Sequence, residues 1–477
     1  SHKTALGVAC ATLAVGLLVP VQMVSQTWDD HDRSGRYTTR DFGMNYLSSV
    51  APDGIIFTNG DNDTFPLWYA QEVEGYRTDV RVVNLSYLTT DWYANQMRVA
   101  TDGAAGLKFS ANPADYAYDR LQFSYYDPDN MVTDTVNVFT SLDDLYHNPD
   151  ATWKGSRVMR MPYMYIPSNA EAAAKAGVIS ERELPAAEET IDVALYRDPK
   201  NPVGGATLSQ ALSLDMIATQ AKEGWNRPAY FAMTVPDEYY LSLSPYLRNT
   251  GLAYQVSPLL NPDGSRETWI DTDKMYANIT EKFRWGGLDK AGKDGDIYLD
   301  ETVRRMVTTH RTAMADLAMA LYVEGIEALD SVGGRKPDTV YAADRFTKAA
   351  RILDMIEEKL PVSVSPYSIQ TGYQIADAYL RLAAETGDEK LYDKGMKITI
   401  GEIERYAAYL PYFNELRRTL PGSGFSGLSP ADRYVPTYLY LLLQLYAEEG
   451  GDLNVISESL AKKGINLDDL EAYLPNR

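Results

Sequence analysis

The most informative stretch in the first half of this chain is Gly54-Ile-Ile-Phe-Thr-Asn-Gly-Asp-Asn-Asp-Thr-Phe-Pro-Leu-Trp-Tyr-Ala-Gln71. Its apolar run breaks at Asn59-Gly60, passes through a polar turn and continues into a helix-like segment. A second apolar run, Asp79-Val-Arg-Val-Val-Asn-Leu-Ser86, follows after Gly75. The order strand, turn, helix, strand predicts a βαβ unit, and therefore an α/β domain with a parallel, Rossmann-like sheet.

A candidate ligand-binding site lies in the polar turn of this unit. Ligands of parallel sheets collect at the carboxyl ends of the strands, where Asp61, Asn62, Asp63 and Thr64 fall. The Asp-x-Asp pattern could hold a divalent cation, because hard cations bind several carboxylate oxygens. The alternative, which we favour, is that Asp63 or Thr64 caps the next helix, with Pro66 in its first turn. We therefore assign no metal to the site.

A second polar cluster follows Trp28 and contains three carboxylates, an imidazole and a guanidinium. A metal or a general acid/base pair could be built from such groups. Consecutive side chains rarely all point at one ligand, however, so a polar juncture at a membrane exit remains the alternative. The candidate residues are Asp29, Asp30, His31, Asp32 and Arg33.

An uncharged run of 21 residues, 4–24, precedes this cluster. At a rise of about 1.5 Å per residue it would be roughly 30 Å long as a helix, which matches the core of a bilayer. Lys3 before the run and acidic residues after it would place the rest of the chain outside the cytoplasm. A signal peptide and a buried core helix are the alternatives.

Charge and composition exclude some functions. The chain has 477 residues and a formal net charge of -21, without a Lys/Arg cluster, so we expect no nucleic-acid partner. Its single cysteine and 4 histidines make a cysteine-based zinc site impossible and a multi-histidine site improbable. The chain also lacks a Gly-rich phosphate loop, a nucleophile elbow and a His-Glu-x-x-His motif.

Four segments are expected along the chain. Residues 1–27 form the membrane helix and residues 28–265 the α/β domain, in which helix and strand patterns alternate. Residues 266–299 form a linker. In residues 300–477 strand signals vanish, and amphipathic stretches joined by Gly/Pro turns predict a helical repeat domain of the tetratricopeptide type.

Seven strings, taken together and in order, resemble one family. This family comprises bacterial multi-pass membrane proteins that carry a "domain of unknown function" label and are similar to an animal transmembrane protein O-mannosyltransferase. The strings cover most of residues 20–330; they are Trp28-Asp-Asp-His-Asp-Arg-Ser34, Tyr37-Thr-Thr-Arg-Asp-Phe42, Thr58-Asn-Gly-Asp-Asn-Asp-Thr-Phe-Pro-Leu-Trp-Tyr69, Asp79-Val-Arg-Val-Val-Asn-Leu-Ser86, Trp225-Asn-Arg-Pro-Ala-Tyr-Phe231, Tyr246-Leu-Arg-Asn-Thr-Gly-Leu-Ala-Tyr254 and Phe283-Arg-Trp-Gly-Gly-Leu-Asp289.

The resemblance implies a GT-C type glycosyltransferase with an exoplasmic active site and a lipid-linked sugar donor. The catalytic acid of that architecture usually lies in the first exoplasmic loop, so the resemblance assigns no catalytic residue here. Residues 4–24 would be the last span of a larger protein, anchored in the inner membrane. The remainder would be a periplasmic portion that binds an acceptor protein or peptide, or braces the membrane part.

Three hypotheses follow. In the first, the chain is the exoplasmic portion of a membrane O-glycosyltransferase. In the second, it is a membrane-tethered module whose repeats bind a protein. In the third, it is a metal-dependent enzyme built on Asp61 and Asp63, with Asp29 or Asp32. We favour the first, because long strings match in order.

Overall fold

A computed structural model describes most of the chain. The described residues are 2–31, 35–126, 130–153, 155–195, 204–261, 269–290, 297, 299–331, 336–419, 428–430 and 432–474.

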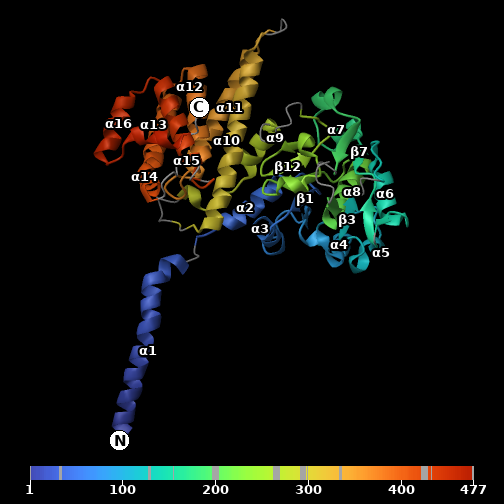
Figure 1. The fold of residues 1–477 in the computed structure, drawn as a ribbon, viewed down its shortest axis with the longest axis horizontal. Coiled ribbons are helices and arrows are strands. Elements are labelled where there is room, and N and C mark those ends of the chain that lie inside the picture. Colours follow the sequence, from blue (N-terminus) through green and yellow to red (C-terminus); the bar gives the residue numbers. More distant parts are fainter. Residues whose placement is uncertain are drawn as a thin grey trace.

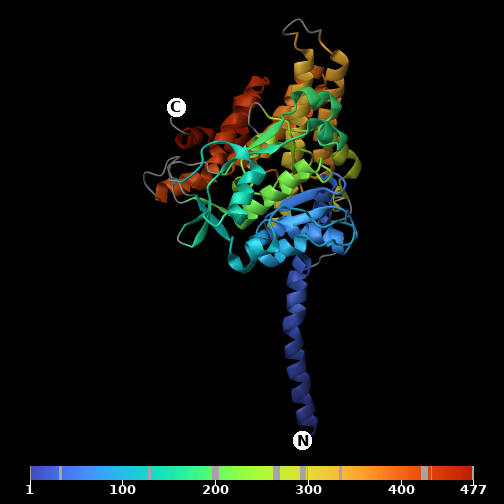
Figure 2. The same ribbon diagram turned by 90° about the vertical axis from the view of Figure 1, so that its right-hand side faces the viewer.

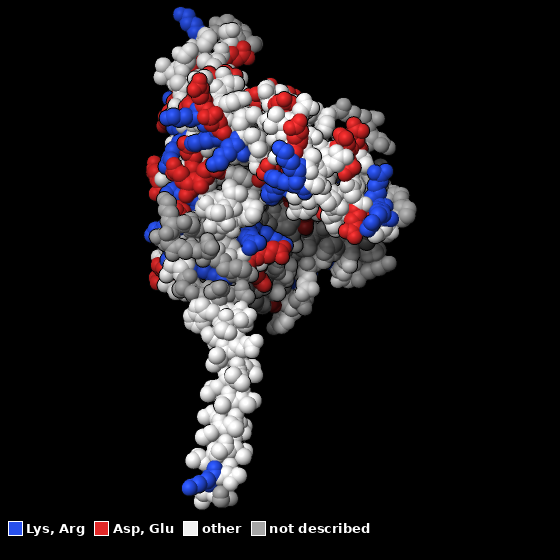
Figure 3. Space-filling model, turned by 90° about the vertical axis from the view of Figure 1, so that its left-hand side faces the viewer, with Lys and Arg blue, Asp and Glu red and all other residues white. Residues whose placement is uncertain are grey.

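The first helix, α1 (His2–His31), extends away from the rest of the molecule (Figure 1). Its segment His2–Trp28 is long and apolar enough to cross a membrane, and none of that segment is buried against the protein. In Figure 3 the helix is an uncharged stem with a basic group only at its far end, where the sequence has Lys3. The described helix therefore has the length and the surface of a membrane span.

A five-stranded sheet lies at the centre of the first half, in the order β11-β12-β10-β1-β2. β1 pairs in parallel with β2, as the βαβ pattern predicts, and also with β10, whereas β12 is antiparallel to β10 and to β11. The strands are β1 (Ile55–Thr58), β2 (Arg81–Asn84), β10 (Ala229–Ala232), β11 (Leu247–Asn249) and β12 (Ala253–Val256).

The sheet is therefore mixed, so the expected parallel sheet is confirmed for β1, β2 and β10 but not for β11 and β12. Only three residues, 250–252, connect β11 to β12. A connection this short closes an antiparallel hairpin, because parallel neighbours need a crossover of about a dozen residues or more. Whether the domain is Rossmann-like beyond its parallel strands stays a prediction.

The first half also contains two smaller sheets, in the orders β5-β6-β3-β9 and β4-β7-β8. Their strands are β3 (Phe123–Tyr126), β4 (Val136–Asn137), β5 (Thr152–Trp153), β6 (Ser156–Met159), β7 (Tyr163–Pro167), β8 (Thr190–Ala194) and β9 (Gly205–Thr207). The α-helices of this half are α2 (Thr38–Ser48), α3 (Asp61–Glu72), α4 (Asp91–Met97), α5 (Pro113–Tyr116), α6 (Val138–His147), α7 (Ala170–Lys175), α8 (Leu208–Lys222) and α9 (Thr272–Ala277).

The helix α3 is held close to α2 by a glycine. A Cβ atom at Gly43 of α2 would lie 2.3 Å from the carbonyl oxygen of Pro66 in α3, so any side chain there would force the helices apart. This contact fixes α3 over the parallel strands and thereby positions both cavities described below.

Residues 299–474 are helical, and the described part of this region contains no strand. α10 packs against α11, and α12 packs against α13 (Figure 1). The helices are α10 (Glu301–Leu329), α11 (Thr339–Lys359), α12 (Ile369–Thr386), α13 (Glu389–Ala407), α14 (Leu410–Thr419), α15 (Tyr434–Glu448) and α16 (Leu453–Lys462). The amphipathic pattern of the sequence thus predicts the helices correctly, while their tetratricopeptide-like character stays a prediction.

One hydrophobic core connects the two halves of the body. It contains Phe42 and Phe231 from the sheet half and Leu317 and Leu353 from the helical half. α10 contacts both α2 and α9, and Figure 2 shows the helical layer lying against the sheet half. In the expected linker, 266–299, the described part includes α9 and η6 (Asn278–Lys282), which contribute buried side chains to that core. The division into domains stays a prediction.

Candidate functional site

The polar turn predicted as a ligand site lies at the carboxyl ends of the parallel strands. β1 ends at Thr58, and α3 begins only three residues later, at Asp61. β2 ends nearby at Asn84, and Thr234 follows the end of β10. The helix start and three strand ends therefore meet at one edge of the sheet, as the βαβ pattern requires.

A buried hydrogen-bond network ties these strand ends together through Asp63 and Thr64. The Asp63 carboxylate accepts from the Asn59 N–H at 3.2 Å and from the Thr234 hydroxyl at 2.9 Å. The Thr64 hydroxyl donates to the Thr58 hydroxyl oxygen at 2.7 Å and accepts from the Asn84 side-chain amide at 2.8 Å. These contacts link β1, β2 and β10 to the first turn of α3.

The cap itself differs from the prediction. Gly60 occupies the N-cap position, Asp63 is the third residue of the helix, and Pro66 lies in its second turn. Because the helix starts at Asp61, Asp63 cannot be the cap; its carboxylate reaches back to the N–H of Asn59 instead. An acidic side chain at the third position satisfies a free N–H before the helix in this way. The cap prediction is wrong in position, although the carboxylate does serve the helix start.

A cavity of ≈ 260 Å³ opens at this sheet edge, and we name it the sheet-edge cavity. Asn62 and Asp63 line it from α3, and Arg305 and Met306 line it from α10, so it lies between the two halves of the body. Asp61 is exposed and does not line it. Of the four predicted site residues, two line the cavity (Asn62 and Asp63), Asp61 lies outside it on the surface, and Thr64 is buried. The role of these four residues as a ligand site stays a prediction.

Metal-binding groups do not gather here. Within the described part of the chain, no group of three or more His, Cys, Asp or Glu side chains could hold a metal ion. The second polar cluster cannot be placed: the side chains of Asp29, Asp30 and His31, and all of Asp32 and Arg33, lie outside the described residues.

A buried histidine joins α10 to the sheet half beside this cavity. His310 accepts from the Asn45 amide through Nε2 at 2.8 Å, and its Nδ1–H donates to the Met306 carbonyl at 2.8 Å. The rings of Phe42 and Phe283 lie 5.5 and 6.0 Å from the imidazole. Burial lowers the pKa of His310 to about 4, so the ring is neutral at pH 7.

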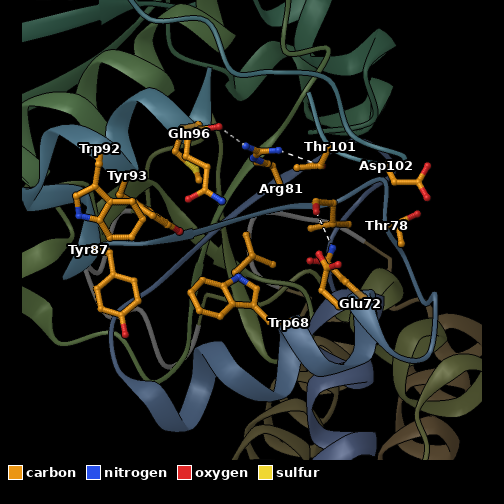
Figure 4. Close-up of a pocket in the computed structure, with 14 residues that line it drawn as sticks. Trp68, Glu72, Thr78, Arg81, Tyr87, Trp92, Tyr93, Gln96, Thr101 and Asp102 are labelled. Carbon is orange, nitrogen blue, oxygen red and sulfur yellow. Dashed lines mark hydrogen bonds between the residues drawn. The ribbon is translucent and has the colours of Figure 1, made fainter. Parts of the chain in front are cut away.

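A second cavity lies beside the C-terminal part of α3, and the sequence interpretation missed it. This aromatic pocket has a volume of ≈ 350 Å³ and is lined by residues of α3, β2, α4 and the 3-10 helix η1 (Tyr87–Thr89). In Figure 4 the rings of Trp68, Tyr87 and Trp92 occupy one side of the pocket. Polar side chains occupy the other: Glu72, Thr78, Arg81, Thr101 and Asp102.

The Arg81 guanidinium is the electrostatic centre of this pocket. It is only 4% exposed and donates to the Thr101 hydroxyl at 3.0 Å and to the Gln96 carbonyl at 2.8 Å. Among the described residues, no carboxylate lies within ion-pair distance of it. Burial lowers the pKa of Arg81, as expected for a cation without a carboxylate partner.

The fold and cavities define a mixed α/β domain with attached helices, preceded by one helix able to span a membrane. Residues 39–274 match the family model described as TMEM260-associated domain 2. TMEM260 is an animal protein O-mannosyltransferase, so the match supports a relation of this region to that family. No solved structure matches the chain.

The matched region contains every residue that lines the aromatic pocket, but only part of the lining of the sheet-edge cavity, which α10 completes. Its first residue, Thr39, is in α2, and its last, Lys274, is in α9. The relation therefore covers the sheet half, while the helices from α10 onward and α1 lie outside the match. The family link suggests a glycosyltransferase-related membrane protein.

Proposed function

We propose that this chain is the exoplasmic, periplasmic portion of an inner-membrane protein O-glycosyltransferase of the O-mannosyltransferase-like kind, in which it binds the acceptor protein. The observation that carries the proposal is the family match over residues 39–274, which starts just after a helix able to span a membrane. The donor would be a lipid-linked sugar used by the membrane part.

A groove in the helical half supports acceptor binding. It has a volume of ≈ 850 Å³ and lies between α15, α16 and the 3-10 helix η10 (Leu467–Tyr473). Leucines line it together with polar side chains such as Gln444 and Asp468. A lining that combines apolar and polar side chains suits a polypeptide segment with one apolar face. We name it the C-terminal groove.

The test uses the whole protein in its own cells. Leu453 lines the C-terminal groove and is 42% exposed, so Leu453→Glu places a charge in the groove without disturbing the core. The matched control is Val323→Glu, because Val323 is 46% exposed on α10, which does not line the groove. O-glycosylation of cell-envelope proteins is measured by mass spectrometry after deletion and complementation.

We expect deletion to abolish O-glycosylation of a set of envelope proteins. Leu453→Glu should restore it at least several-fold less well than Val323→Glu, at equal amounts of membrane-bound protein. Unchanged glycosylation after deletion would contradict the transferase role and favour a tethered protein-binding module. Equal rescue by both variants would contradict the C-terminal groove as the acceptor site.

A further inference from the structure

We propose that the aromatic pocket binds a neutral pyranose, free or as part of a glycan. This proposal goes beyond acceptor binding in the C-terminal groove and does not rest on it.

The aromatic side of the pocket is a platform of rings. Trp68 and Tyr87, which line the pocket, have ring centroids 6.1 Å apart and planes 29° apart. Phe65 lies outside the lining and stacks on Trp68 at 5.7 Å and 25°. Tyr87 then contacts Trp92 at 6.4 Å and 42°. Tyr93 stands edge-on to Tyr87 and Trp92, at 75° and 79°, and borders the apolar face that the other rings of the pocket form. Such a face suits the flat C–H side of a sugar ring, which leaves the hydroxyl groups at its edge.

The opposite side of the pocket offers both hydrogen-bond donors and acceptors. Arg81 and Thr101 can donate, while the carboxylates of Glu72 and Asp102 can only accept when ionised. In Figure 4 these groups face the rings across the cavity. A ligand held here therefore needs one apolar face and an edge that both donates and accepts, which describes a polyhydroxylated ring.

Charge excludes two other ligand classes. Glu72 and Asp102 outnumber Arg81 at the pocket, and the chain carries a net charge of -21, so an anionic ligand is disfavoured. A cationic ligand would meet the buried Arg81 guanidinium, which has no carboxylate partner among the described residues. A neutral ligand avoids both penalties.

The size of the cavity agrees with a small ligand. Its ≈ 350 Å³ lies at the lower end of the range of about 300–1,000 Å³ found for small-molecule sites. A lipid surface is the competing occupant, because Trp92 is 57% exposed and Phe65 is 46% exposed. A membrane surface would contact the exposed aromatic rings but not the polar side of the pocket. A sugar would contact both sides, so it accounts for more of the residues that line the pocket.

The test is a titration of the full chain in a detergent without a sugar headgroup. The probes are the methyl glycosides of glucose, mannose and galactose, with glucuronate and glucosamine as charged comparators. Binding is followed by tryptophan fluorescence and by saturation-transfer NMR. We expect at least one neutral glycoside to bind with a Kd of about 1 mM, in the range usual for small polar ligands.

The variants localise the binding. Trp92→Ala should weaken it about 2- to 10-fold, the range measured for one aromatic contact, and Trp92→Phe should weaken it less. Asp102→Asn tests the polar side and should also weaken binding. The matched control is Trp153→Ala, because Trp153 is 49% exposed in β5, away from the pocket, and this variant should bind like the parent.

Three results would overturn the proposal. The first is the absence of binding by every neutral glycoside, including the case in which phosphatidylcholine vesicles alone change the tryptophan fluorescence of the parent but not that of Trp92→Ala. The second is tighter binding of a charged sugar than of its neutral analogue. The third is equal binding by Trp92→Ala, Asp102→Asn and Trp153→Ala. None of these depends on O-glycosylation in cells, so this proposal and the proposed function can fail separately.

Discussion

The two cavities beside α3 differ in how their polar groups are used. At the sheet-edge cavity the Asp63 carboxylate and the Thr64 hydroxyl already have partners on the strand ends and on the helix start. In the aromatic pocket a buried cation lacks a carboxylate partner among the described residues, and aromatic rings stand partly exposed. The polar groups of the sheet-edge cavity therefore stabilise the fold, whereas those of the aromatic pocket remain able to bind a ligand. Substitutions in each cavity test this difference.

The largest effect is expected at Asp63. Replacing this buried carboxylate by Ala leaves the Asn59 N–H and the Thr234 hydroxyl without their acceptor. We expect Asp63→Ala to lower the free energy of unfolding by about 3 kcal/mol. Denaturant titration of the full chain in detergent, followed by circular dichroism, measures the loss.

Asp102→Ala is the control for Asp63→Ala, because Asp102 is an exposed aspartate of the aromatic pocket. It should change stability by less than about 0.5 kcal/mol. Equal losses of unfolding free energy in the two variants would contradict the distinction between the sheet-edge cavity, whose polar groups stabilise the fold, and the aromatic pocket, whose polar groups can bind a ligand.

The next effect depends on pH and concerns His310. Its pKa is lowered from the ordinary 6.5 to about 4 by burial, so the unfolded chain takes up a proton at a higher pH than the folded chain. The stability that the neutral ring gives is complete above pH 6.5 and is lost as the pH falls towards 4. Between pH 7 and pH 5 the loss is about 2 kcal/mol.

His310→Gln isolates this contribution, because Gln does not titrate and can still accept from the Asn45 amide. The difference in unfolding free energy between pH 7 and pH 5 should be smaller in the variant by that amount. A pH dependence identical in both proteins would show that the ring is not held neutral at the contact between α2 and α10.

A smaller effect is expected at Arg81. Arg81→Met removes two hydrogen bonds but also a buried cation, and the two changes oppose each other. Thr101 and Gln96 are exposed residues, so water can replace the guanidinium as their partner. We expect stability to change by about 1 kcal/mol or less in the denaturant titration. A loss as large as that of Asp63→Ala would make Arg81 a structural residue and weaken the case for a ligand pocket.

The sequence correctly predicted those features of the fold that depend on residues close together in the chain. The order of β1, α3 and β2 followed from the apolar runs and the turn between them, and so did the position of Asp63 at the sheet edge. The antiparallel placement of β12 could not be predicted, because strand order depends on contacts between distant segments. The aromatic pocket was missed because Trp68, Tyr87 and Trp92 come from three elements, and the apolar runs do not specify how these elements pack. The signal available was the recurrence of large aromatic residues on both sides of the second strand.

The smallest effect is expected at Asp61, the residue of the Asp-x-Asp pattern that lies outside the sheet-edge cavity. It is the first residue of α3 and is exposed, so its carboxylate acts mainly on the helix dipole. Asp61→Asn should lower stability by about 0.5 kcal/mol, and added salt should reduce that difference. A thermal-unfolding series with and without Mg²⁺ tests the metal hypothesis in the same variant. If Mg²⁺ raised the Tm of the parent but not that of Asp61→Asn, Asp61 would belong to a cation site, and the sheet-edge cavity would join the aromatic pocket as a place for a ligand.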